Sequence, residues 1–188
     1  HGACLMVGCE KKVFKRYESL FRDLSLNKQH TNILQNVGML QGGGWYASVG
    51  KSGAGHFVKM VHNGIEYGMM QSLAEGFHVM KQSKFRLNLK EIARLYNQGS
   101  VIESRLVGWL LKAYEEHGED LKDISGEVAQ SGEGLWTVET AKELGVPVEI
   151  IKKSLEFRLK SKGNQSYTGQ VISALRNQFG RHDVQTRT

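Results

Sequence analysis

The sequence predicts a mainly α-helical protein that is preceded by a short α/β segment. Only one proline, Pro147, interrupts the 188 residues, and apolar residues recur at three-to-four spacing over most of the chain. This spacing is typical of amphipathic helices, and strand-like stretches occur only near the beginning. The length and the 40% apolar content allow a sizeable core in one domain, or in one domain and a fraction.

The beginning of the chain has the pattern of the end of an α/β domain. Residues 3–8 form a short apolar run typical of a buried strand, and residues 45–49 predict one more strand. Between them, residues 11–24 carry a helical apolar stripe and residues 27–44 are polar and glycine-rich. The stripe consists of Val13, Tyr17, Leu20, Phe21 and Leu24. We therefore expect a first domain over residues 1–52.

A helical domain is expected over residues 53–188. Its first and longest helix begins near Gly55 and ends at about Lys81, because apolar residues recur on several of its faces. Capping boxes predict the next two helix starts, and Gly145 and Pro147 separate two later helices. The predicted elements are helices from Asn88 with Glu91, from Ser100 with Glu103 to near Gly118, over 137–144, from Pro147 to about Lys160, and over 168–179.

Composition and charge exclude several classes of protein. No apolar run reaches the ~18 residues that cross a bilayer, so we expect a soluble, cytoplasmic protein without a membrane partner. Cys4 and Cys9 are read as free thiols, and neither they nor the histidines form a metal-binding spacing. Residues 152–188 hold eight basic and two acidic residues, whereas the first 151 are neutral. Such a local excess attracts anions of unspecified kind.

Five polar residues of the long predicted helix share one face. Their positions, at ~100° per residue, span an arc of roughly 140°; they are Lys59, His62, Asn63, Glu66 and Tyr67. One interpretation is the solvated face of an amphipathic helix. Two observations favour a site instead: Gly64 and Gly68 each cost up to ~1 kcal/mol within a helix, and the stripe contains both a base-capable lysine and an acid-capable glutamate.

The same stretch resembles a known family. Residues 55–68, GHFVKMVHNGIEYG, are similar to the signature of the decarboxylating 6-phosphogluconate dehydrogenases of the short bacterial type. Gly55, Lys59 and Asn63 also match the G-x3-K-x2-N pattern of the wider β-hydroxyacid dehydrogenase superfamily. The resemblance continues in SGEGLWT at 131–137, LGVPV at 144–148 and RNQFGRH at 176–182. It implies the family's C-terminal helical domain, preceded by a remnant of a Rossmann domain.

The resemblance implies an activity and its catalytic groups. Family members oxidise 6-phosphogluconate with NADP or NAD, and the β-keto acid then loses CO2 to give ribulose 5-phosphate. Lys59 would be the base, which requires burial or neighbouring cations to depress its pKa, and Glu66 would protonate the enediol. His62 and Asn63 would hold the substrate's hydroxyls and carboxylate.

The resemblance also implies a phosphate site and a partner. Tyr67 and Arg158 would bind the phosphate, and Arg176 with His182 match a pair that the family takes from the C-terminal segment of a second subunit. We therefore expect a homodimer whose partner completes the site. The alternative for Arg158 and Arg176 is that they are surface arginines on helices.

Two departures from the family pattern limit these expectations. Ser131 stands where some members have a lysine, and no G-x-G-x-x-G fingerprint or Ser-Gly-Gly substrate loop occurs in the chain. The triple glycine at 42–44 lacks the flanking strand and helix. We expect a fragment of the enzyme, inactive alone and binding no cofactor.

Two other functions stay open. A β-hydroxyacid dehydrogenase acting on a substrate without phosphate would keep Lys59 and Asn63 but would not need Arg176 and His182. A noncatalytic helical dimerisation or nucleic-acid-binding module would fit the pI of about 9.3. The chain shows no recognisable nucleic-acid-binding motif, so we expect no such partner.

Overall fold

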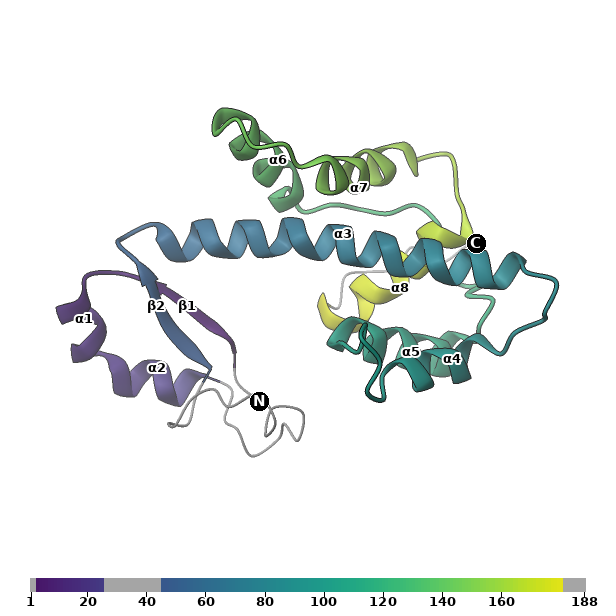
Figure 1. Cartoon of the computed structure of the whole chain (residues 1–188), viewed down its shortest axis with the longest axis horizontal. Helices are drawn as coiled ribbons and strands as arrows, with labels where there is room; N and C mark the ends of the chain where they lie inside the picture. The colour runs from purple at the N-terminus through teal and green to yellow at the C-terminus, as the bar shows by residue number, and fades with distance from the viewer. Residues whose placement is uncertain (1–2, 26–44, 181–188) are drawn as a thin grey trace. The chain divides into compact units, whose positions relative to one another are not determined.

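The computed structural model describes residues 3–25 and 45–180. The chain divides into two compact units, His1–His62 and Asn63–Thr188, and helix α3 runs through the division as one continuous helix, Ala54–Gln82 (Figure 1). The predicted helix from Gly55 to about Lys81 is therefore confirmed. The predicted division into residues 1–52 and 53–188 stays a prediction.

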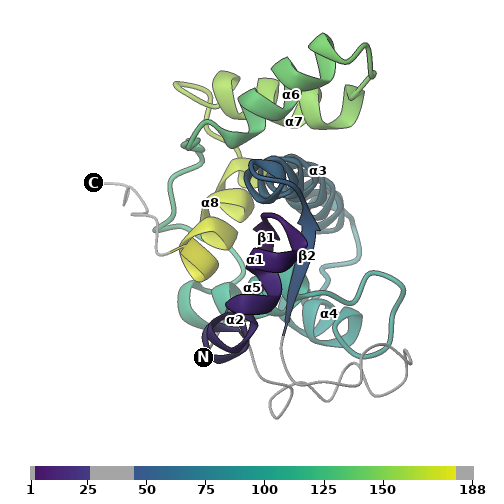
Figure 2. The ribbon, with the colours of Figure 1, turned by 90° about the vertical axis from the view of Figure 1, so that its left-hand side faces the viewer.

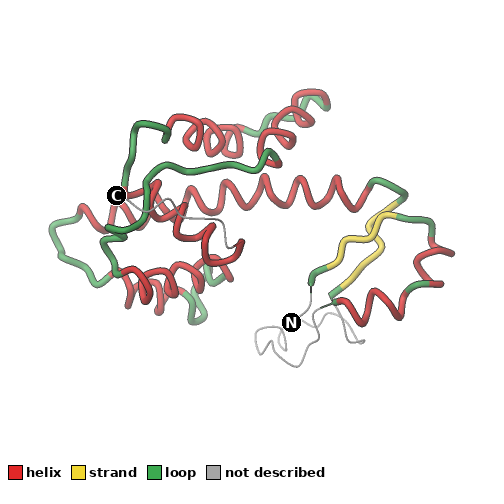
Figure 3. Tube along the Cα trace, turned by 180° about the vertical axis from the view of Figure 1, so that it is seen from behind, coloured by secondary structure: helices red, strands yellow, loops and turns green. Residues whose placement is uncertain are grey.

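The first unit contains a small parallel sheet. Strand β1 (Leu5–Gly8) pairs with β2 (Tyr46–Gly50), so that Leu5 lies opposite Tyr46 and Gly8 opposite Gly50. Figure 3 shows the two strands side by side. The start of α3 packs directly on β1, since a Cβ at Gly55 would collide with the carbonyl oxygen of Met6. Both predicted strands are confirmed, with slightly different ends.

The predicted helix over residues 11–24 is wrong in one respect, because it is two helices. Helix α1 (Lys11–Arg16) and helix α2 (Glu18–Leu24) are separated at Tyr17, whose φ of −110° and ψ of 14° are not helical. Phe14 and Phe21 stack across this break, with their ring centroids 5.3 Å apart. Val13, Tyr17, Leu20 and Leu24 of the predicted stripe are exposed in the described structure.

The second unit is a helical assembly organised around one buried helix. Its elements after α3 are α4 (Leu89–Tyr96), α5 (Arg105–His117), α6 (Glu133–Glu143), α7 (Glu149–Lys160) and α8 (Tyr167–Gly180). Ten consecutive residues of α8, Tyr167–Arg176, are buried. A helix that is buried on all sides lies in the centre of a core. Helix α8 packs against α5, and α6 and α7 lie side by side (Figures 1 and 2).

Side chains of α8 also hold the long connection between α5 and α6. Gln170 Nε2 donates to the carbonyl oxygens of Leu121 and Ile124, at 2.8 and 3.0 Å, and Ser173 Oγ donates to Glu127 O at 3.1 Å. These bonds satisfy carbonyl groups of an irregular segment that has no ladder of its own. Helix α8 therefore fixes this connection from within the core.

The ends of the helices follow the predicted caps with two corrections. Asn88 Oδ1 accepts from Glu91 N at 2.9 Å, as predicted. The N-cap of α5, however, is Ser104, which accepts from Val107 N. The predicted cap, Ser100, instead forms a turn with Glu103, whose carboxylate accepts from Gly99 N.

Helix α6 begins four residues before the predicted residue 137, because Gly132 supplies the N-cap in a left-handed conformation.

Gly64 brings α3 and α6 together. A Cβ at this position would lie 2.6 Å from Cγ2 and 2.9 Å from Oγ1 of Thr137, a buried residue of α6. Close approach of two helices therefore explains a glycine that the helix interior otherwise disfavours.

Replacing Gly64 with alanine should destabilise the protein. We expect Gly64→Ala to lower the free energy of unfolding by ~1–2 kcal/mol, because overpacking costs ~1–3 kcal/mol and the gain in helix propensity offsets up to ~1 kcal/mol of it. Urea unfolding would measure the change.

Gly76→Ala is the matched control on the same helix. Gly76 is exposed and a Cβ there would have no atom within 4 Å, so alanine should stabilise by ~0.5–1 kcal/mol. Equal effects of the two changes would contradict the packing explanation.

Candidate functional site

The polar stripe of α3 is a set of residues on one helix, but its members differ in exposure. In the first unit, Lys59 and His62 are exposed, and Lys59 Nζ lies 3.2 Å from His62 Nδ1. The burial that was expected to favour a neutral Lys59 is absent from the described structure.

Tyr67 is the most buried member of the stripe. Its side chain is 4% exposed, whereas Asn63 and Glu66 are half-buried. The first turn of α6 lies against its ring: a Cβ at Gly134 would be 2.7 Å from Cδ2 and 2.8 Å from Cζ of Tyr67. Only a glycine at position 134 allows α6 to begin this close to the ring.

Arg158 of α7 stacks on the same ring. Its Cζ lies 3.3 Å from the centroid of Tyr67, and the residue is 3% exposed. A guanidinium over an aromatic face is attracted by the ring quadrupole, and more strongly when water is excluded. This contact holds the charged end of Arg158 in a fixed place.

Arg176 of α8 adds a second buried cation. It is 7% exposed, and its charge acts on Arg158. Burial lowers the pKa of Arg158 to about 10, and the charge of Arg176 acts in the same direction, whereas Tyr67 and then Glu66 oppose this change. Burial also lowers the pKa of Arg176, and Tyr67, Glu133 and Glu66 oppose that change. We call Glu66, Tyr67, Glu133, Arg158 and Arg176 the arginine cluster.

The cluster contains polar atoms that the described chain does not satisfy. The hydroxyl of Tyr67 and Nη2 of Arg158 are buried and have no hydrogen-bond partner among the described residues. A buried donor without a partner costs ~1–3 kcal/mol. Two desolvated cations, one of them with an unused donor, are suited to bind an anion that has several acceptor oxygens.

The N-terminus of α6 adds to this electrostatic field. Its N-cap, Gly132, has a φ of 99° and makes no side-chain capping bond, and Glu133 is the acidic residue of the first turn. Unpaired N–H groups and the helix dipole favour negative charge at this end. Since Gly134 packs on Tyr67, this helix end belongs to the arginine cluster.

The structure decides between the two interpretations of the arginines. Arg158 and Arg176 are both buried, so the alternative of surface arginines is wrong. Arg176 lies on α8, where its charge acts on Arg158 of the same chain, and the expectation that a second subunit supplies an arginine and a histidine stays a prediction. His182, the predicted partner of Arg176, lies outside the described residues.

Sequence reasoning assigned no role to Glu133 or Gly134. Both lie in the SGEGLWT motif at 131–137, which was noted only for its resemblance and for Ser131, an exposed residue. The sequence does place Glu133 between two glycines just before a helix, a pattern that can mark a functional helix N-terminus. This pattern could not show that the helix begins against Tyr67, because the contact joins residues that are distant in sequence.

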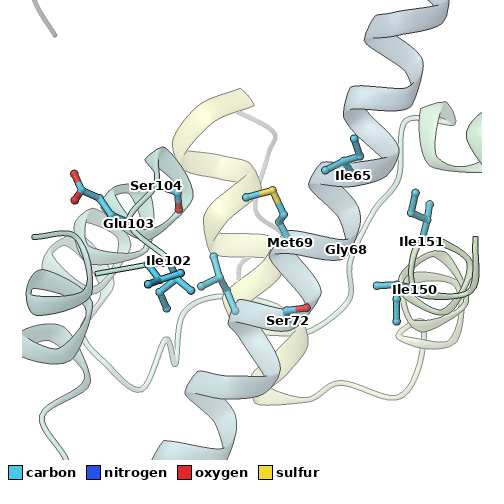
Figure 4. Close-up of a pocket in the computed structure, with 11 residues that line it drawn as sticks. Ile65, Gly68, Met69, Ser72, Ile102, Glu103, Ser104, Ile150 and Ile151 are labelled. Atoms are coloured by element: carbon cyan, nitrogen blue, oxygen red, sulfur yellow. The ribbon is translucent and has the colours of Figure 1, made fainter. Parts of the chain in front are cut away.

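A second feature of this unit is an apolar pocket of about 620 Å³ between α3, α7 and residues 101–104. Figure 4 shows its side chains, among them Ile65, Met69, Ile102 and Ile150. Two of its three polar side chains are already used, since Glu103 accepts from Gly99 N and Ser104 caps α5; the third is Ser72. The pocket therefore offers apolar surface and little chemistry.

The part of the chain that the structure describes contains neither a metal-binding cluster nor a membrane-spanning helix. Across residues 3–25 and 45–180, no three His, Cys, Asp or Glu side chains are grouped as metal ligands would be. No helix in the same ranges combines the length and the apolar character needed to cross a membrane.

Comparisons with known proteins give a consistent family. Residues 55–169 match the family profile described as 6-phosphogluconate dehydrogenase, C-terminal domain. The chain is 41% identical over 187 residues to YqeC of Bacillus subtilis (strain 168), covering 100% of this chain and 57% of the relative. It is 41% identical over 139 residues to the NAD(+)-dependent, decarboxylating 6-phosphogluconate dehydrogenase of Haloferax volcanii, covering 74% of this chain and 46% of the relative.

A solved structure supports the fold. Plasmodium falciparum 6-phosphogluconate dehydrogenase matches with a TM-score of 0.63 at 22% identity, over 95% of this chain and 41% of that chain. At this identity the likeness concerns the fold alone. The chain spans about half the length of the curated relatives it matches.

The unpaired hydroxyl of Tyr67 leads to a prediction about stability. Tyr67→Phe keeps the ring beneath Arg158 and removes a buried group without a partner, so the free energy of unfolding should stay unchanged or rise by up to ~1 kcal/mol. Tyr67→Leu loses the ring and should cost ~1–3 kcal/mol. Urea unfolding of both variants would measure this, and a loss in Tyr67→Phe as large as in Tyr67→Leu would contradict it.

Proposed function

Because the chain belongs to the 6-phosphogluconate dehydrogenase family, we propose that it forms the part of such an enzyme that binds a phosphorylated sugar acid. The arginine cluster carries this proposal. Arg158 and Arg176 are buried, Arg158 is fixed on the ring of Tyr67, and the N-terminus of α6 lies against the same ring. A phosphate group offers this cluster the acceptor oxygens that Nη2 of Arg158 lacks.

We assign the phosphate of 6-phosphogluconate to Tyr67, Arg158 and Arg176, with His182 as a further ligand. His62 and Asn63 bind the hydroxyl groups and the carboxylate of the substrate. The two arginines support this assignment because a superfamily enzyme acting on a substrate without phosphate would have no use for two buried cations.

We further propose that Glu66 and Lys59 are the proton-transfer groups. Glu66 is half-buried in the arginine cluster, where it can deliver a proton to a bound enediol. Lys59 acts as the base on the substrate hydroxyl and later, protonated, polarises the keto oxygen while CO2 leaves. Because Lys59 is exposed in the described chain, this role requires that bound substrate or further protein desolvate it.

The described residues do not fit the nicotinamide cofactor that the family uses. The sheet of the first unit has two strands, and the turn from β1 into α1 reads Gly8-Cys9-Glu10. A dinucleotide-binding turn needs glycines at which the backbone approaches the pyrophosphate and a helix N-terminus that receives it. We therefore assign no hydride-transfer step to these residues.

A second copy of this chain is the proposed partner. The apolar pocket supports it, because Ile65 and Ile150 are 53% and 67% exposed there, and contiguous apolar surface is typical of subunit interfaces. A cytoplasmic location also stays a proposal.

Binding of 6-phosphogluconate should depend on the two arginines. We expect Arg158→Met and Arg176→Met each to weaken binding to the 188-residue chain by about 10- to 100-fold, since a hydrogen bond to a charged group contributes ~1.5–3 kcal/mol. Isothermal titration calorimetry would measure this.

The matched control is Arg94→Met. Arg94 is exposed on α4 and pairs with Glu91, so its loss should leave the affinity unchanged. If all three variants bound equally well, or if the wild-type chain did not bind 6-phosphogluconate, the proposed function would be wrong.

The chain by itself should not act as a dehydrogenase. We expect the purified protein, mixed with 6-phosphogluconate and NADP or NAD, to show no increase in absorbance from the reduced cofactor. The reason is that its described residues lack a dinucleotide-binding turn. Measurable reduction of either cofactor would contradict this prediction.

A further inference from the structure

Ser161 is a buried residue that binds the backbone of Arg158. It is the C-cap of α7 and is 2% exposed. Its hydroxyl donates to the carbonyl oxygen of Arg158 at 2.6 Å and accepts from the N–H of Val128 at 2.8 Å. One hydroxyl therefore joins the last turn of α7 to the connection between α5 and α6.

Arg158 lies in the part of α7 that most needs such a bond. It belongs to the last turn, whose carbonyl groups have no partner further along the helix. The N–H of Ser161 also donates to Arg158 O, at 3.2 Å, but only the hydroxyl of Ser161 reaches Val128. Val128 is 3% exposed, and a buried N–H without an acceptor would favour opening of this contact.

The two segments that Ser161 joins both lead to the ring of Tyr67. The guanidinium of Arg158 lies 3.3 Å from the centroid of this ring. Six residues after Val128, Gly134 packs on the same ring. A buried cation is costly unless the surrounding structure holds it in place. Ser161 is placed to do so, because it fixes the backbone from which the arginine side chain extends.

We propose that Ser161 is a positioning residue, whose hydroxyl holds the last turn of α7 to Val128 and so keeps the guanidinium of Arg158 on the ring of Tyr67. Through Arg158, Ser161 supports binding of the phosphorylated ligand, and this effect rests on the proposed function. The placement of Arg158 concerns contacts within the chain and depends on no ligand.

The first test measures the accessibility of Arg158 without a ligand. Phenylglyoxal condenses with accessible guanidinium groups, and mass spectrometry of proteolytic peptides gives the rate at each arginine. We expect Ser161→Ala to raise the rate at Arg158 by about fivefold or more, which corresponds to the ~1 kcal/mol that an unsatisfied buried donor costs at the least. The rate at Arg94, exposed on α4, should stay unchanged.

Ser154→Ala is the matched control on the same helix. Ser154 is 1% exposed, and its hydroxyl donates to Ile150 O at 2.8 Å, within α7. The change removes a buried hydroxyl without freeing the last turn, so the rate at Arg158 should rise by less than about twofold.

Ser161→Cys is a second test variant. It nearly keeps the volume of the side chain but replaces the hydroxyl with a thiol, which is a weak donor and a weak acceptor. It should therefore also raise the rate at Arg158. If melting curves show that Ser161→Ala is not folded, Ser161→Cys takes its place in both tests.

The second test measures the affinity of the 188-residue chain for 6-phosphogluconate by titration calorimetry. Ser161→Ala should weaken binding by about three- to tenfold, since part of the contribution of Arg158 is lost. In the background of Arg158→Met it should weaken binding by less than about twofold, because residues that act through one group are not additive. A residue with only a structural role would lower the melting temperature and leave the affinity of the folded chain unchanged.

The outcomes distinguish this inference from the proposed function. An unchanged rate at Arg158 in the Ser161 variants, or an equal rise in Ser154→Ala, would overturn the positioning role. Equal weakening of binding by Ser161→Ala with and without Arg158→Met would overturn its action through Arg158. A raised rate at Arg158, together with no binding of 6-phosphogluconate by the wild type, would support the positioning role and refute the proposed function.

Discussion

The stacking of Arg158 on Tyr67 is the contact on which the candidate site depends. It fixes a buried cation on α7 against a residue of α3, and the same ring receives the first turn of α6. Burying a charge without a counter-ion is costly, so the surrounding structure has to hold the arginine in place. The buried helix α8 provides the second cation, Arg176, and is itself fixed by the core.

Small residues make this arrangement possible. Gly64 lets α6 approach α3 at Thr137, and Gly134 lets the end of α6 reach the ring of Tyr67. Each glycine weakens its own helix by up to ~1 kcal/mol. This loss of helix stability accompanies the close approach of α6 to α3. The approach places the N-terminus of α6, which has no side-chain cap, in the arginine cluster. The fold and the candidate site therefore depend on the same two contacts.

Local sequence signals predicted most of the fold. The long helix α3, the cap at Asn88, the helix end at Gly118 and the helix α8 all follow from periodicity and capping chemistry, which act between neighbours in the chain. The two wrong predictions, the N-cap of α5 and the single helix over residues 11–24, also come from reading local signals alone. Ser100 and Ser104 are both possible N-cap residues by sequence, and only Ser104 caps the helix. The break at Tyr17 accompanies the stacking of Phe14 on Phe21. Such choices depend on packing that periodicity does not contain.

For the candidate site, the sequence by itself determined the residue types: a lysine, a glutamate and a tyrosine on one arc of α3, and arginines at 158 and 176. The spacing of a single helix is sufficient for the first group. Only the tertiary structure decided that both arginines are buried, that one chain brings them together, and that Glu133 shares their cluster. The physical reason is that burial and electrostatic proximity arise from contacts among α3, α6, α7 and α8, and no local pattern records which distant residues will meet.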